Sequence, residues 1–231
     1  MLDNRVWVGY KPIGMENISK GDRTRRRLLE VAYEVIRRKG FQAAGLDEIL
    51  SGSGLTKGAL YHHFRDKTAL GYAVLDEIIV EIIQKRWIEP LSAGGDPLML
   101  IPQVLRAAAA GLDDNEIALG CPLGNLSAEM SALDDTFTGR IDSLYGDWRQ
   151  ALAGVLKAGE FTSPTDRRQM ATFIVSAVSG CLARAKSSSL REVLLEGIDE
   201  LEVYLAQRAD KSPAPKYAQP AQSSQMEDFL L

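Results

Sequence analysis

Residues 46–64, with the sequence LDEILSGSGLTKGALYHHF, constrain the fold of this chain more than any other segment. Apolar residues recur at helical spacing on both sides of a glycine-containing break at residues 51–54, which indicates two short amphipathic helices. Helices this short cannot bury their apolar sides alone, so they need a third helix beneath them. Residues 23–39 have a helical apolar period and supply it. The pattern predicts a helix-turn-helix, an arrangement that places its second helix in the DNA major groove.

The rest of the chain also has helical patterns, and no segment is a convincing strand. Further helices are predicted near residues 67–87, 97–111, 123–132, 134–158, 165–187 and 190–208. Pro102 is expected to kink or delay the second of these. The predicted fold class is all-α, with an N-terminal three-helix helix-turn-helix DNA-binding domain over residues 21–68 and a C-terminal helical ligand-binding and dimerisation domain over residues 69–208. The composition predicts a disordered arm at residues 1–20 and a disordered tail at residues 209–231.

Charge is divided unevenly along the chain. Residues 1–70 carry 13 Lys and Arg against 8 Asp and Glu, whereas the remainder carries 14 against 23. A basic first third on an acidic body is typical of a protein with one end that approaches a polyanion. The chain has no apolar run of the roughly 18 residues that a membrane span needs and no signal-peptide pattern at its start, so we expect a cytoplasmic protein without a membrane partner.

The second helix of the pair has an outer side suited to a duplex. Lys57, Tyr61 and His62 share one side of it, opposite the apolar residues Leu60 and Phe64. Small residues beside them let the backbone approach a groove, and lysine can reach a guanine edge or a phosphate. An ordinary surface helix would also fit this pattern. The predicted DNA contacts are Arg25, Thr56, Lys57, Gly58, Ala59, Tyr61, His62, His63 and Lys67.

These residues resemble the DNA-binding domain of the TetR family of repressors. The resemblance covers residues 23–70 and is strongest in GLTKGALYHHF at 54–64, followed by Asp66 and Lys67. The Gly40-Phe41 pair and the Asp47-Glu48-Ile49 run also fit. The family usually has Thr or Ser before the second helix, whereas Ala44 and Gly45 stand here. The resemblance therefore implies DNA binding, with a helix that lacks a strong N-cap.

The same resemblance implies a homodimer that binds a palindromic operator and is released by a small molecule. Residues 120–130 and 180–186 resemble the NemR/AcuR-like branch of the family, whose members respond to electrophiles or acrylate. The dimer interface is expected in the helices near 165–187 and 190–208, which contain several small residues.

Cys121, Asn125 and Arg184 are the candidate ligand- or redox-sensing residues. Cys121 precedes a predicted helix, whose N-terminal dipole would favour a reactive thiolate. The alternative is that Cys121 is a small buried apolar residue, and Cys181 is expected to be one. Arg184 and Lys186 have two interpretations, as partners of an acidic ligand or of carboxylates across the dimer.

The sequence offers no support for an enzyme. It has no phosphate-binding glycine loop, no nucleophile motif and no metal-spaced His/Cys set, so neither a cofactor nor a metal is predicted. Adjacent His62 and His63 point to different faces, which argues against a joint metal site. The predicted function is a ligand- or redox-responsive repressor. The alternative is a DNA-binding regulator with no small-molecule inducer, either a constitutive repressor or an activator.

Overall fold

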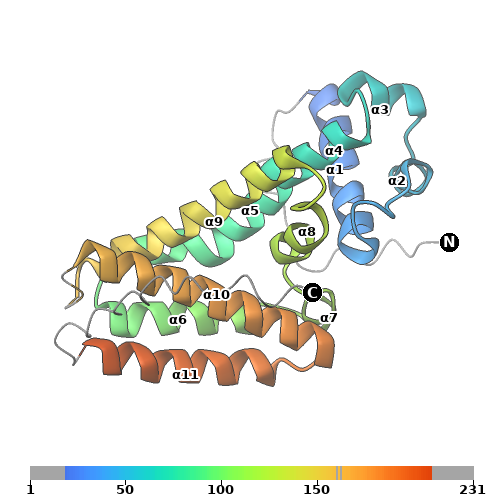
Figure 1. Cartoon of the computed structure of the whole chain (residues 1–231). Helices are drawn as coiled ribbons and strands as arrows, with labels where there is room; N and C mark the ends of the chain where they lie inside the picture. The colour runs from blue at the N-terminus through green and yellow to red at the C-terminus, as the bar shows by residue number, and fades with distance from the viewer. Residues whose placement is uncertain (1–18, 160, 162, 210–231) are drawn as a thin grey trace, which may run out of the picture.

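The computed structural model describes residues 19–159, 161 and 163–209, and within these ranges it contains helices and no β-strand (Figure 1). This confirms the all-α fold class. The arm predicted over residues 1–20 and the tail predicted over residues 209–231 lie outside the described residues, except at their inner ends.

Three helices form an N-terminal unit. They are α1 (Lys20–Lys39), α2 (Leu46–Ser53) and α3 (Lys57–His63). Gly40 ends α1 at φ 85° and Gly54 ends α2 at φ 69°, conformations that favour glycine. Gly45 precedes α2 and provides no side-chain cap, as the sequence predicted.

A long helix then leads away from the N-terminal unit. The sequence predicted one helix from 67 to 87, and the structure has a continuous run that contains two π-helical stretches. Its segments are α4 (Lys67–Ala73), η1 (Val74–Ile79), α5 (Val80–Ile83) and η2 (Gln84–Ile88), and a 3₁₀ segment, η3 (Glu89–Ala93), follows. Of these segments, α4 and η1 pack on α1, and η2 packs on α9.

The remaining helices form the C-terminal part of the molecule. They are α6 (Pro97–Ala110), α7 (Asp114–Leu119), α8 (Pro122–Met130), α9 (Asp135–Leu156), α10 (Pro164–Ser188) and α11 (Glu192–Ala209). The expected delay at Pro102 is wrong, because α6 begins at Pro97 and continues through this proline. Helix α7 was not predicted, although Asp113 and Glu116 form the capping box that starts it.

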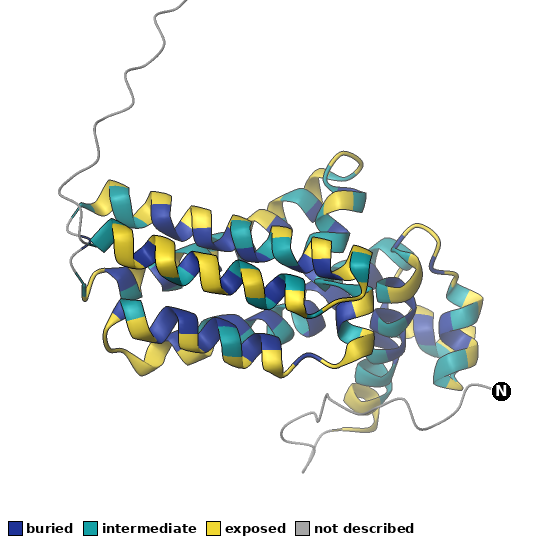
Figure 2. Cartoon of the chain, turned by 90° about the horizontal axis from the view of Figure 1, so that it is seen from below, coloured by how far each residue is buried: buried dark blue, intermediate teal, exposed yellow. Residues whose placement is uncertain are grey.

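The C-terminal core lies between α9, α10, α11 and the long helix, with buried residues on the inner sides of the ribbons and exposed residues outside (Figure 2). Trp148 of α9 is buried, and its ring lies 5.3 Å from that of Trp87 in η2. Burying one large apolar side chain stabilises a fold by about 1.5–3 kcal/mol, so this core fixes the helices on which the functional surfaces are built. None of the described helices combines the length and the apolarity that a membrane span requires.

Candidate functional site

The outer side of α3 is exposed and polar. Its exposed residues are Lys57, Gly58, Tyr61 and His62. Leu60 and Phe64 are buried, and α3 packs on α1. The predicted division of α3 into a polar outer side and an apolar inner side is therefore confirmed.

The N-terminus of α3 is fixed by Thr56. Its Oγ1 accepts a hydrogen bond from the backbone N–H of Ala59 at 3.2 Å. A hydroxyl that accepts this bond keeps its own hydrogen, so Thr56 can still donate to a phosphate oxygen. Packing does not explain Gly58, because the nearest atom to a Cβ placed there is Thr56 Oγ1 at 3.8 Å. The absent side chain instead suits close approach of a partner to the helix backbone.

Lys57 is held only weakly by its neighbour. Its Nζ lies 3.4 Å from Oδ1 of Asp47, and both side chains are largely exposed. Exposed pairs of this kind contribute about 0–1 kcal/mol. Lys57 can therefore exchange Asp47 for a phosphate at little cost.

His63 is half-buried beside two other rings. Its ring centroid lies 5.0 Å from that of His62 and 6.3 Å from that of Phe64. Burial, together with the charge of His62, lowers the pKa of His63. At neutral pH the ring is therefore uncharged, and it has one N–H that can donate to a phosphate oxygen.

Lys67, the first residue of α4, supports the turn that follows α1. Its Nζ donates to the backbone carbonyl of Gln42 at 2.8 Å and lies 4.9 Å from the centroid of the Phe41 ring. Burial lowers the pKa of Lys67. Replacing Lys67 would disturb this turn as well as any phosphate contact, so it is a poor probe of DNA binding alone.

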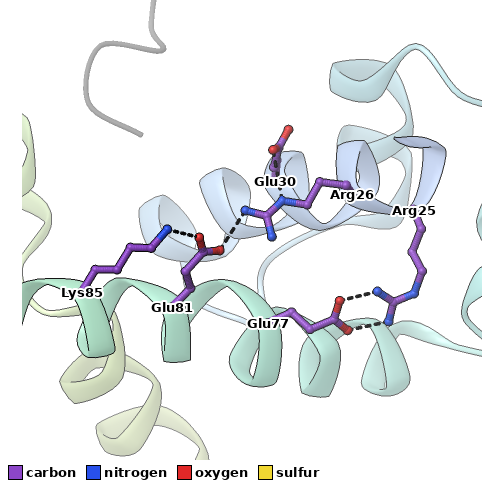
Figure 3. A network of polar contacts seen from close by, with 6 residues as sticks. All are labelled: Arg25, Arg26, Glu30, Glu77, Glu81 and Lys85. Carbon is purple, nitrogen blue, oxygen red and sulfur yellow. Dashed lines mark hydrogen bonds and ion pairs between the residues drawn. The ribbon is translucent and has the colours of Figure 1, made fainter. Parts of the chain in front are cut away.

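Arg25 joins α1 to the long helix (Figure 3). Its two terminal nitrogens donate to the two carboxylate oxygens of Glu77 in η1, and its guanidinium lies 5.1 Å from the centroid of the Phe64 ring. Nearby, Arg26 donates to Glu81 of α5 at 3.1 Å. The sequence interpretation placed Arg25 at a DNA-facing edge, whereas in the structure its guanidinium is engaged at the junction between the N-terminal unit and the long helix.

A carboxylate from α8 holds the turn after α1 from the other side. Glu129 accepts hydrogen bonds from the backbone N–H groups of Phe41 at 2.7 Å and Gln42 at 2.8 Å. A Cβ at Gly40 would lie 2.8 Å from the same carboxylate, so only glycine fits there. We call this arrangement the Glu129 clamp. Sequence reasoning did not single out Glu129 or Glu77, and the required Gly40 was the only local signal of a close approach.

An aromatic cluster fills the space behind the clamp. Phe41 lies 5.0 Å and Tyr72 4.7 Å, centroid to centroid, from Phe137 of α9. The Tyr72 hydroxyl donates to the carboxylate of Asp134, the residue that caps α9, at 2.8 Å. The N-terminal unit is thus packed on α4 and α9 as well as being bonded to α8.

A cavity of about 420 Å³ opens between the second half of α1, α8 and the end of α10, and we call it the junction cavity. Asn125 and Lys186 line it. The Asn125 side chain donates to the carbonyl of Leu119 at 2.7 Å and accepts from Lys186 Nζ at 2.9 Å. Of the predicted sensing residues, Asn125 therefore lies at this cavity, beside Lys186, for which the sequence left two interpretations, as a partner of an acidic ligand or of carboxylates across the dimer.

Cys121 lies at a second, much smaller cavity of about 30 Å³, enclosed by residues that include Trp87 and Leu182. Its Sγ accepts from the Gly124 N–H at 3.5 Å and caps α8. Burial nevertheless raises the pKa of the Cys121 thiol, and the helix N–H groups offset this only in part. The helix N–H groups favour the thiolate, as expected, but desolvation outweighs them, so a reactive thiolate is not favoured.

The other two predicted residues lie elsewhere on α10. Arg184 is exposed and lines neither the junction cavity nor the small one. Cys181 fills the space between α10 and α11, where a Cβ at Gly197 would lie 2.2 Å from its Sγ. Within the described residues, no group of His, Cys, Asp or Glu side chains is arranged to hold a metal ion.

Two family models match this chain. The model for bacterial regulatory proteins of the tetR family matches residues 28–74, and the model for the C-terminal domain of LmrA/YxaF-like transcriptional regulators matches residues 97–198. The first covers the later part of α1, the helix pair and α4, and the second covers α6 to α10 and the start of α11.

Individual proteins agree with this assignment. The transcriptional regulator AcuR of Cereibacter sphaeroides is 28% identical over 166 residues, which are 69% of this chain and 74% of that protein. The transcriptional repressor NemR of Escherichia coli is 30% identical over 120 residues, 52% of this chain and 60% of that protein.

Solved structures share the fold. The reduced form of Escherichia coli NemR has a TM-score of 0.67 at 25% identity and covers 77% of this chain and 95% of its own. A TetR transcriptional regulator from Chloroflexus aurantiacus has a TM-score of 0.72 at 23% identity and covers 82% of this chain and 98% of its own. With the exposed side of α3 and the two matching family models, these likenesses establish that the chain belongs to the TetR family of bacterial transcriptional regulators and is not an enzyme.

Proposed function

We propose that the protein is a cytoplasmic homodimeric repressor that binds a palindromic operator through α3 and is released by a small-molecule effector. The exposed polar side of α3, on a helix capped by Thr56 and packed on α1, is the observation that carries this proposal. In this proposal Lys57, Tyr61 and His62 contact base edges and phosphates, and Thr56 and His63 donate to phosphates.

The homodimer is supported by the outer faces of α10 and α11. Phe173 and Tyr204 are 45% and 39% exposed, and their ring centroids lie 4.8 Å apart. Val203 beside them is 51% exposed. Large apolar side chains gathered on one surface mark an interaction site, and an isologous dimer would cover the same surface on both copies. Gly180, whose Cβ position is open, continues this face along α10.

Replacing Lys57 with alanine is expected to weaken binding to the DNA upstream of the gene by about tenfold and to reduce the salt dependence by about one phosphate contact. A gel shift at several salt concentrations measures both quantities. The side chain is largely exposed and has only a weak partner, so the variant should fold normally.

Lys157→Ala is the matched control for this experiment. Lys157 is exposed and caps the C-terminal end of α9. Figure 1 shows this end of α9 at the opposite end of the molecule from α3. Removal of Lys157 changes the net charge equally and should leave the affinity within about twofold. An equal loss of DNA affinity in the two variants would contradict the placement of α3 at the DNA interface.

The effector is supported by the junction cavity, whose volume of about 420 Å³ lies in the range of small-molecule sites. The alternative, a regulator with no inducer, is supported by the small size of the cavity at Cys121, which holds only about 30 Å³. We favour the effector-responsive regulator, since the larger of these two cavities has room for a small molecule.

Cys121 is a second candidate trigger, because it caps the same helix that carries the Glu129 clamp. Its raised pKa leaves little thiolate at neutral pH. Alkylation of Cys121 by iodoacetamide in the native protein is therefore expected to be slow at pH 7 and to accelerate about tenfold per pH unit as long as the pH lies below the raised pKa of the thiol. Mass spectrometry of the Cys121 peptide gives the rate, and a plateau already reached at pH 7 would contradict the raised pKa.

The role of this thiol in release is decided by two serine variants. If acryloyl compounds or an oxidant release the DNA through Cys121, release is lost in Cys121→Ser and kept in Cys181→Ser, since Cys181 is packed between α10 and α11. Release that persists in Cys121→Ser excludes the thiol trigger.

A further inference from the structure

The junction cavity has a strongly basic lining. Four cationic side chains and one carboxylate line it, namely Arg37, Arg38, Lys39, Lys186 and Glu129. Both oxygens of Glu129 already accept backbone hydrogen bonds from the turn after α1, which offsets its charge locally. Lys39 pairs with Glu48 of α2 at 2.7 Å and Arg37 pairs with Glu34 at 3.2 Å, so among the described residues Arg38 and Lys186 are the lining cations without an ion pair.

Lys186 is the cation best placed to meet a ligand. Its stem lies over Gly120, where φ is +73° and an added Cβ would be only 2.8 Å from Lys186 Cδ. Its ammonium donates to the neutral amide oxygen of Asn125 at 2.9 Å. Within the described residues, no carboxylate lies within ion-pair distance of it. The lysine is therefore positioned by packing and by one amide, and its charge is not neutralised by a protein partner.

Arg37 also lines the cavity and is itself held in place. Its Nε donates to Glu34 at 3.2 Å, and its guanidinium lies 5.6 Å from the centroid of the Tyr33 ring. Only 14% of its side chain is exposed. A cation fixed in this way loses little freedom when it meets an anion.

The same cavity also has an apolar part. Ile36, Ile79 and Leu126, from α1, η1 and α8, line it and are buried. A ligand that matches both parts of the lining has an apolar body and a negatively charged head.

We propose that the junction cavity binds a small amphipathic anion, with a carboxylate or sulfonate head paired to Lys186 and an apolar body against Ile36, Ile79 and Leu126. This inference rests on the proposed function, because it names the class of effector that would release the DNA. It differs from the neighbouring cavity at Cys121, which shares Tyr33, Arg37 and Pro122 with the junction cavity and is too small for such a molecule.

Binding there couples directly to the position of the N-terminal unit. The cavity is lined by α1 on one side and by α8 and α10 on the other, so one ligand contacts both sides of the junction. The affinity of this ligand then depends on the orientation of the N-terminal unit relative to α8. DNA binding depends on the same orientation. By linkage, the anion lowers DNA affinity by the same factor by which DNA lowers anion affinity.

The test uses two fluorescent probes that differ only in charge. 8-Anilinonaphthalene-1-sulfonate has the proposed anionic head, and N-phenyl-1-naphthylamine is the same body without it. The native protein should bind the sulfonate more tightly than the amine. Lys186→Met keeps an unbranched stem over Gly120 and removes the charge, so it should weaken sulfonate binding about tenfold and leave amine binding unchanged.

Two further variants make the result specific. Lys186→Arg should restore most of the sulfonate affinity, and Lys157→Met, which removes an equal charge from the far end of α9, should change neither probe. Equal sulfonate affinities in Lys186→Met and Lys157→Met would overturn the anion site, as would a native protein that binds both probes equally.

A gel shift with the upstream DNA separates this inference from the proposed function. Saturating sulfonate should weaken DNA binding by the native protein and not by Lys186→Met, whose DNA affinity without the probe stays within about twofold. If the native protein does not bind the DNA in the gel shift, the proposed function is overturned. If the native protein binds the DNA with the same affinity in the presence and absence of bound sulfonate, only the coupling between the cavity and DNA binding is overturned.

Discussion

Replacing Gly71 with alanine is expected to lower the free energy of unfolding by about 1–3 kcal/mol, although alanine is normally the better helix residue. Gly71 is buried in α4, and an added Cβ would lie 2.3 Å from Phe41 Cε2 and 3.0 Å from Phe137 Cζ. Neither ring can withdraw easily. Phe137 is fully buried, and the backbone of Phe41 is held by Glu129. The overlap must therefore shift the turn after α1 or separate it from α9.

Gly139→Ala in α9 is the matched control, because nothing lies within 4 Å of a Cβ at that position. There the substitution only removes backbone freedom from the unfolded chain, and we expect a gain of about 0.5–1 kcal/mol. Thermal unfolding should show opposite signs, with about 2–4 °C of shift per kcal/mol for a chain of this size. A Gly71→Ala protein that melts no lower than Gly139→Ala would contradict the packing at the junction.

Replacing Gly180 with glutamate is expected to convert the protein to monomers and to abolish detectable operator binding. A Cβ at Gly180 meets open space within one copy, so the isolated chain tolerates the change. In an isologous dimer each copy would bury an unpaired carboxylate, at a cost of about 3–5 kcal/mol, which corresponds to a hundredfold or larger loss in association. Sedimentation velocity measures the oligomeric state, and a gel shift measures the accompanying loss of DNA affinity.

Gly154→Glu provides the comparison for this variant. Gly154 is an exposed helical glycine of α9 that is equally free of neighbours, and the change adds the same charge. It should remain dimeric and bind DNA. A dimeric Gly180→Glu protein would place the interface on another face than that of α10 and α11.

Local signals in the sequence were enough to predict α3 and its surroundings. The spacing of Leu60 and Phe64 set the buried side, and Thr56 was recognised as a cap because its hydrogen bond reaches only three residues along the chain. The missing cap at Gly45 followed from the same local rule. The resemblance to the TetR family added what spacing alone could not, the identity of the partner.

Contacts between distant residues were beyond that kind of reasoning. Arg25 and Glu77 are 52 positions apart, and Phe41 and Glu129 are 88 apart, so no local period relates them. The pKa of Cys121 was also beyond prediction from local sequence. Its position at a helix start could be predicted from the sequence, but the burial that raises its pKa comes from the helices packed around it. The junction cavity likewise exists only once α1, α8 and α10 meet.

The Glu129 clamp has a consequence for the modularity of this regulator. The turn between α1 and α2 takes two of its backbone bonds from a residue in α8, and α2 itself starts without a side-chain cap. The hydrogen bonding of this turn therefore depends on Glu129, which lies 88 residues after Phe41 in the sequence. A chimera that joins residues 19–66 to the C-terminal half of another regulator would have to carry an equivalent carboxylate on its α8. Without such a carboxylate, the transplanted helix pair would lose the two hydrogen bonds that hold the turn between α1 and α2.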